Sequence, residues 1–248
     1  MLNYMKAELY KVARRRSVYG VLILLLAGVT ILVLLWRYFN TVGTFETSLQ
    51  AMLTASFSVG FFITIVTGEA VFSDQYKNNT MKNEVSIGIP RVRIYLGKLW
   101  VQCILSIVLC LITVVYGCVL SRILLPYDAV TGGQTVGILF FGILVALPLW
   151  LGTQAFVNFL YFFCKSSTVA SIAAVFILLF VPSIFQLLAM LCSEAFWTVY
   201  YALLNTRLDL FTFTVDWDML AGTCAVGVGW FVACTLAGVA AFRKREIS

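Results

Sequence analysis

Few residues in this chain could do chemistry, because it has no histidine and only 11% of its residues are charged. Glu69 is the one carboxylate that lies inside a long apolar run, about one helical turn from the end of that run. A charge at the centre of a bilayer costs on the order of several kcal/mol, so such a residue is a functional candidate. Two interpretations stay open: a role in a transport pathway or in coupling, and a carboxylate satisfied at the membrane interface.

Two further polar residues are candidates for a transport pathway. Gln154 and Asn158 lie four residues apart in an apolar run, which places them on one face of a helix. They could line a polar cavity, or they could hydrogen-bond to neighbouring helices. With Glu69 they form the predicted substrate pathway.

The usual enzyme signatures are missing from the sequence. Without histidine there is no Ser–His or Cys–His pair and no H-E-x-x-H motif. Gly97-Lys98 is followed by Leu99 and does not make a phosphate-binding loop. The seven cysteines form no C-x-x-C pair and lie mostly in apolar runs, as packing residues do. We therefore expect no enzyme activity, no metal site and no cofactor bound by this chain.

The composition places the chain among membrane proteins. Hydrophobic residues make up 62% of the sequence and the mean hydropathy is +0.98. We expect an all-α polytopic membrane protein with one transmembrane domain over residues 1–248. Six segments are long and apolar enough to span a bilayer as helices: 18–36, 49–72, 99–124, 136–163, 168–191 and 220–242.

The remaining segments have distinct compositions. Residues 1–17 are basic and amphipathic, which predicts an elbow helix on the membrane surface. Residues 73–98 form the one long polar connection. Residues 192–219 are too polar to span but rich in aromatic residues. That pattern predicts short interfacial or re-entrant helices, or an aromatic belt without a further role.

The basic residues predict the orientation. Fourteen of the seventeen Lys and Arg residues lie in the N-terminal segment, the 73–98 loop, the hairpin at 164–167 or the C-terminal tail. The other side of the predicted membrane has only Arg37, Arg122 and Arg207. The positive-inside rule therefore predicts that both termini and the 73–98 loop are cytoplasmic. This uneven distribution gives no indication of a nucleic-acid partner.

The last predicted span carries small residues at every fourth position. Such a stripe lets another helix approach closely. We favour a neighbour in the same chain over one in a second copy. The residues are Ala221, Ala225, Gly229, Ala233, Ala237 and Ala241.

The polar connection contains a predicted short helix, about Thr80 to Ile87. Asn78, Asn79 and Thr80 are turn and N-cap residue types, and Glu84 falls in the first turn after them. Pro90 would end the helix, since the residue before a proline avoids the helical region. The helix could be a docking site for a cytoplasmic partner, or the loop could serve only to fix the topology.

The stretch from Phe72 to Trp100 resembles the permease subunits of ABC-2 type ABC transporters. The chain departs from their pattern at Gln75 and Asn79, where the family commonly has Glu and Gly. The matching residues are Phe72, Ser73, Tyr76, Thr80, Lys82, Asn83, Ser86, Gly88, Ile89, Arg91, Ile94, Tyr95, Gly97 and Lys98.

The resemblance implies a permease that pairs with a second copy or a paralogue, usually through the first and fifth spans. Ala170 and Ala174 in the fifth span have a spacing that would suit such packing. It also implies a separate cytoplasmic ATPase, which would bind ATP and Mg²⁺ and dock on a coupling helix. The residues that would couple to it are Thr80, Met81, Lys82, Asn83, Glu84, Ser86, Ile87, Gly88, Ile89 and Arg91.

The family mostly exports lipids, polysaccharides, drugs or peptides. This short chain looks most like bacterial permeases of peptide-antibiotic and lantibiotic immunity, in the cell membrane. The alternatives are a secondary transporter that uses Glu69 as a proton site and a membrane adaptor or sensor that does not transport. An intramembrane enzyme comes last, for want of catalytic residues.

Overall fold

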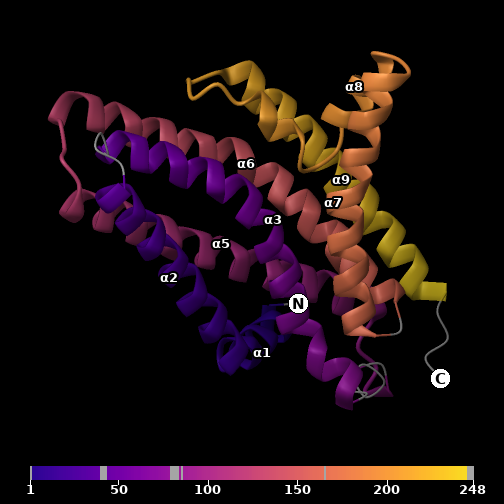
Figure 1. Ribbon diagram of the computed structural model, residues 1–248. Helices are drawn as coiled ribbons and strands as arrows, with labels where there is room; N and C mark the ends of the chain where they lie inside the picture. The colour runs from indigo at the N-terminus through magenta and orange to yellow at the C-terminus, as the bar shows by residue number, and fades with distance from the viewer. Residues whose placement is uncertain (1, 40–43, 79–83, 85, 165, 245–248) are drawn as a thin grey trace.

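The protein is a bundle of long helices, described here from a computed structural model (Figure 1). The structure describes residues 2–39, 44–78, 84, 86–164 and 166–244. About 88% of it is helix, and no strand occurs in these ranges. The prediction of an all-helical membrane protein is therefore confirmed.

Six helices are long and apolar enough to cross a membrane, as predicted. A short helix, α1 (Leu2–Ala13), precedes them, and α8 (Ala195–Tyr201) and the 3₁₀ helix η1 (Arg207–Leu210) lie before the last one. The six long helices are α2 (Arg16–Phe39), α3 (Phe45–Asn78), α5 (Arg91–Leu124), α6 (Ala129–Phe163), α7 (Ser167–Leu191) and α9 (Trp217–Lys244).

Three of these helices, α3, α5 and α6, extend well past the apolar segments that the sequence indicates. α3 and α5 each have 34 residues, which is roughly 51 Å of helix against roughly 30 Å of bilayer core. The polar connection predicted at 73–98 is therefore largely helical at both ends. Asn78 ends α3 instead of preceding a new helix. Helices α3 and α5 thus continue without a break from their spans to the short segment that connects them.

Helix α6 lies at the centre of the bundle and contacts α3, α5, α7 and α9. Its closest neighbour is α9, and two glycines allow that approach. A Cβ on Gly227 would lie 2.3 Å from the carbonyl oxygen of Pro148, and one on Gly152 would lie 2.8 Å from that of Gly227. Because these are backbone contacts, neither helix could shift a side chain to make room.

The buried face of α9 differs from the predicted small-residue stripe. Met219, Thr223, Gly227, Cys234, Gly238 and Phe242 are buried. Of the predicted residues, Ala221, Ala225, Gly229, Ala233 and Ala237 are exposed and Ala241 is half-buried. The expectation that this stripe packs within the chain is therefore wrong. On the buried face, Gly227 lies against the Pro148 backbone of α6, Gly238 against Tyr95 of α5, and Phe242 against Phe162 of α6.

The predicted contact residues of α7 also lie elsewhere than expected. Ala170 and Ala174 are completely buried within this chain, so they cannot meet a second copy. The outer face of α7 consists instead of large apolar residues such as Ile172 and Phe176.

The two ends of the described chain lie at the same end of the bundle. Helix α1 packs against α5. The Arg91 guanidinium, at the start of α5, donates to the carbonyl oxygens of Phe242 and Arg243 at 3.1 and 2.7 Å. Arg91 thereby caps the C-terminal end of α9, where carbonyl groups lack helical partners.

Gly227→Ala tests the close contact of α6 and α9. We expect the added methyl group to lower the free energy of unfolding by about 1–3 kcal/mol, because it meets backbone atoms. Gly229→Ala is the matched control, since nothing lies within 4 Å of its Cβ. Thermal unfolding in detergent measures both variants. Equal midpoints would contradict the assigned contact.

Candidate functional site

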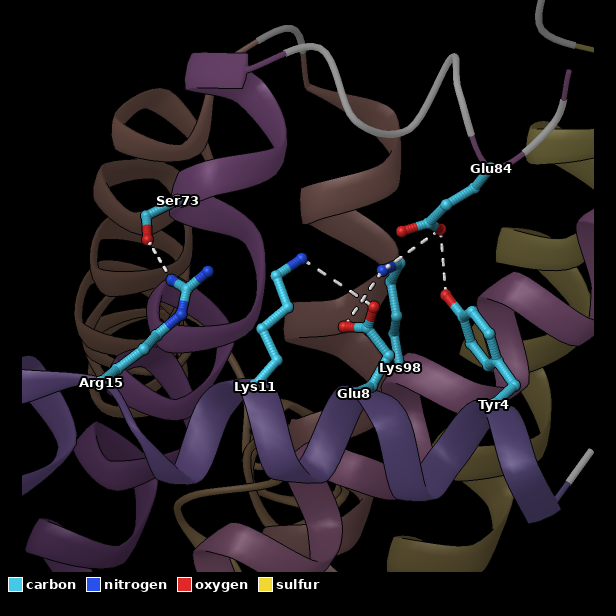
Figure 2. Close-up of polar contacts among 7 residues, drawn as sticks. All are labelled: Tyr4, Glu8, Lys11, Arg15, Ser73, Glu84 and Lys98. Atoms are coloured by element: carbon cyan, nitrogen blue, oxygen red, sulfur yellow. Dashed lines mark hydrogen bonds and ion pairs between the residues drawn. The ribbon is translucent and has the colours of Figure 1, made fainter. Parts of the chain in front are cut away.

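A buried lysine joins three segments at the end of the bundle where α1 lies (Figure 2). The Lys98 side chain, in the second turn of α5, is completely buried. Its Nζ atom lies 3.6 Å from Glu8 Oε2 of α1 and 3.5 Å from Glu84 Oε2 of the connecting segment. We name Lys98, Glu8, Glu84 and Tyr4 the junction cluster.

The side chains that α1 contributes to the junction cluster lie on one face of the helix. Tyr4, Glu8 and Lys11 recur at spacings of four and three residues, which aligns them along the helix. Figure 2 shows them along the side of α1 that faces the other segments, with Arg15 just beyond the end of the helix. Gly97 lets this face come close, since a Cβ there would lie 2.6 Å from the Tyr4 ring.

The electrostatics of the cluster depend on its two carboxylates. Burying an ammonium group costs several kcal/mol, whereas one ion pair at this distance returns on the order of 4 kcal/mol at an effective dielectric constant of 20. Lys98 Nζ makes no hydrogen bond to another described residue, so the two ion pairs are the contacts that oppose the cost of its burial. Lys11 Nζ lies 3.9 Å from Glu8 Oε1 and is more exposed.

Tyr4 fixes the second carboxylate. Its hydroxyl donates to Glu84 Oε2 at 3.0 Å. Burial raises the pKa of Tyr4, and the charges of Glu8 and Glu84 raise it further. The phenol therefore keeps its proton and remains a hydrogen-bond donor to Glu84.

The segment that carries Glu84 ends in a well-defined turn. Glu84 and Ser86 are helical, and Gly88 has a φ of 86°. The Ile89 N–H donates to the Glu84 carbonyl oxygen at 3.3 Å. This six-to-one bond with a left-handed glycine is a Schellman motif. Gly88 ends the helix two residues before Pro90, which caps the start of α5.

Ile87 stands apart from the cluster, because 79% of its surface is exposed. The predicted coupling residues Thr80, Met81, Lys82 and Asn83 lie outside the described residues.

A second contact ties the link between α1 and α2 to α3. Arg15 Nη1 donates to Ser73 Oγ at 2.7 Å (Figure 2). Helix α1 itself contacts α5 and the Glu84 segment, and the residues that follow it are bonded to α3. Any displacement of the Glu84 segment would act on α1 and α5 together.

Glu69 lies apart from this cluster and is satisfied by hydroxyl groups. Tyr161 and Ser171 donate to its Oε2 at 3.0 and 2.9 Å, and Ser167 donates to its Oε1 at 3.1 Å. The side chain is half-buried and lines a cavity of about 440 Å³ with Ser17, Ser73 and Ser171. The oxygens of Glu69 are therefore satisfied, as in the second interpretation, and its role in a transport pathway or in coupling stays a prediction.

Gln154 and Asn158 belong to one buried hydrogen-bond network between α3, α5 and α6. Gln154 Oε1 accepts from Thr67 and Ser106, and its amide nitrogen donates to Gln102 Oε1 at 2.6 Å. Gln102 in turn donates to Asn158 Oδ1 at 2.9 Å. All but Ser106 are fully buried. Of the two interpretations of Gln154 and Asn158, hydrogen bonding between helices describes this arrangement. A small apolar pocket also has Gln154 in its lining.

Sequence reasoning did not anticipate that Lys98 and Tyr4 contact Glu84, or that Glu8 pairs with the same lysine. The signal was present as a polar stripe at positions 4, 8, 11 and 15, beside the apolar stripe of the predicted elbow helix. In the described ranges no three Cys, Asp or Glu side chains gather closely enough to hold a metal ion.

Lys98→Met tests the junction cluster. We expect a loss of about 3–5 kcal/mol in the free energy of unfolding, because two carboxylates would face each other without their cation. Lys11→Met removes a more exposed lysine from the same cluster of charges and should cost less than about 1 kcal/mol. Thermal unfolding in detergent compares them, and similar losses for both variants would show that the ion pairs of Lys98 are unimportant.

The comparisons with known proteins agree with this architecture. No curated protein matches the chain. The family model described as "ABC-2 family transporter protein" matches residues 4–183, which include α1, the Glu84 segment and the helices as far as Pro182 of α7. The predicted resemblance is therefore confirmed at the level of the family. The chain belongs to the ABC-2 family of transporter proteins, as a multi-pass membrane permease.

Proposed function

We propose that this chain is the permease subunit of an ATP-driven exporter in a bacterial cell membrane, with both termini in the cytoplasm. A separate ATPase binds ATP and Mg²⁺ and docks on the segment around Glu84. The concentration of Lys and Arg at the end of the bundle that carries α1 supports this orientation.

The observation that carries the proposal is the buried contact of Lys98 with Glu84. A docking segment must present a surface to its partner and also be attached firmly to the spans. Here Ile87 is exposed, while Glu84 points inward to Lys98 and Tyr4. A push on the segment reaches α5 by two routes, the ion pair and the short link from Gly88 to Pro90. Through Glu8 it also reaches α1.

An open apolar cavity supports amphipathic peptides or lipids as substrates. It measures about 680 Å³ and lies between α2, α3 and α5. Gly20 and Gly28 of α2 face it without any atom within 4 Å of an added Cβ. A groove of this kind accepts acyl chains or apolar side chains. The exposed apolar faces of α2 and α7 would meet lipid or a second permease copy.

Ile87→Glu tests the docking surface. It should abolish co-purification of the partner ATPase, because it places a charge at the centre of an apolar contact, while the ion pairs of Lys98 remain. Val130→Glu is the control: Val130 is 70% exposed and lies at the opposite end of the bundle. A pull-down in mild detergent gives the readout. Full recovery of the ATPase with Ile87→Glu would refute the docking assignment.

Glu69→Gln discriminates ATP-driven export from the alternative, a proton-coupled transporter. The alternative is favoured by the access of Glu69 to a cavity. A glutamine has nearly the same shape and keeps one acceptor oxygen, which can accept either from Ser167 or from Ser171 and Tyr161, but it cannot carry a proton. We expect stimulation of the partner ATPase within about twofold of the unaltered chain, since no charge in the junction cluster changes. Loss of substrate transport together with loss of substrate-coupled proton uptake would instead support the alternative.

A further inference from the structure

A second large cavity lies at the end of the bundle away from α1, and the proposed function does not use it. It measures about 480 Å³ and lies between α3, α7 and the segment that holds α8 and η1. In Figure 1 this segment is at the top of the view, at the far end of α7 from α1. The size falls within the range of about 300–1,000 Å³ that is typical of small-molecule sites.

A proline of α7 lies in the wall of this cavity. Pro182 lies within α7 and lacks an N–H group, so the carbonyl oxygen of Leu178 has no helical donor. The Asn205 amide supplies one at 2.6 Å. The Trp230 indole N–H of α9 donates to the Ala202 carbonyl oxygen at 3.0 Å, on the other side of the same segment. The wall opposite α3 is therefore a fixed part of the fold.

Aromatic rings form much of the lining. Phe57 of α3 meets Phe211 edge to face at 5.4 Å, and Phe211 meets Phe213 in the same way at 5.6 Å. Phe213 has a φ of 56°, a left-handed conformation that is uncommon for a bulky residue. Phe62 completes this aromatic wall.

Asp209 is the one charged residue that lines the cavity in the described part of the chain. Tyr200 donates to its Oδ2 at 2.7 Å, and its carboxylate has no cationic partner among the described residues. Burial and the hydrogen bond to Asp209 raise the pKa of Tyr200, so the tyrosine keeps its proton and remains a donor to Asp209.

Two further polar side chains line the same cavity and have hydrogen-bonding groups that no described residue satisfies. The side chains of Ser58 and Gln186 line the cavity and form no hydrogen bond to other described residues. The charge of this side of the protein is also negative, since it has six carboxylates against three arginines. These residues are Glu46, Asp128, Glu194, Asp209, Asp216, Asp218, Arg37, Arg122 and Arg207.

We propose that this cavity is a binding site for a lipophilic cation, such as an amine or quaternary group attached to an apolar body. The cationic group lies against Asp209 and the faces of the aromatic rings, which attract cations electrostatically. The apolar body fills the space between Phe57, Phe62 and Phe211. The inference rests on the proposed function only in placing this cavity on the outer side of the membrane.

The test is equilibrium binding of tritiated tetraphenylphosphonium to the full chain in phosphatidylcholine nanodiscs, corrected for empty nanodiscs. We expect saturable binding that Asp209→Asn weakens roughly tenfold, because it removes the charge that faces the cation. The asparagine keeps an oxygen that accepts from Tyr200, so the fold should persist. The control Asp218→Asn removes a nearby carboxylate that does not line the cavity, and it should bind as the unaltered chain does.

Two more measurements test whether binding depends on the charge of the ligand and on this cavity. Triphenylphosphine oxide, a neutral compound of similar shape, should not compete. Ser58→Phe, which fills the cavity from an exposed position on α3, should abolish binding. No saturable binding, or equal binding by Asp209→Asn and Asp218→Asn, would overturn the proposal.

The assay uses neither the partner ATPase nor ATP. If binding fails while the ATPase still co-purifies, only this inference is lost. If binding holds and no ATPase co-purifies, the site stands and the proposed function fails.

Discussion

The arrangement of the cytoplasmic end, as we propose it, depends on the need to neutralise one buried ammonium group. Lys98 lies inside the protein with its Nζ atom at ion-pair distance from two carboxylates. Neither Glu8 nor Glu84 belongs to α5, the helix that carries Lys98. Burial of the lysine therefore requires that α1 and the Glu84 segment both stay in place. A single charge thereby makes three pieces of the chain interdependent.

This constraint gives several other residues their roles. Gly97 is small so that α1 can lie against α5. Gly88 takes the left-handed conformation that turns the chain from Glu84 into α5. Arg91 then fastens the start of α5 to the end of α9. Further into the bundle, the buried amides of Gln102, Gln154 and Asn158 tie α5 to α6 and to α3. In our proposal, movement at the Glu84 segment is transmitted through these paired polar groups.

The sequence predicted the features that depend on local composition. Six apolar segments were enough to predict the number of spans. The residues around Gly88 and Lys98 were enough to predict the family. Packing partners were harder to predict, because an exposed and a buried face of α9 both contain small residues. Gly227 and Ala225 are both small residues in the same apolar segment, so the sequence does not show which of them packs against another helix. In the structure it is Gly227 that lies against the backbone of Pro148. Ala170 and Ala174 were misassigned for the same reason. Glu8 and Lys98 are 90 residues apart, and no local pattern pairs them.

The central claim is that the junction cluster carries motion from the docked ATPase to α1 and α5. Amide hydrogen exchange on the complex, with and without a non-hydrolysable ATP analogue, measures this directly. In the unaltered protein, the analogue should change exchange in the Glu84 segment, in α1 and at the start of α5. In Lys98→Met the change should be confined to the Glu84 segment. An undiminished response of α1 and α5 in that variant would contradict the account.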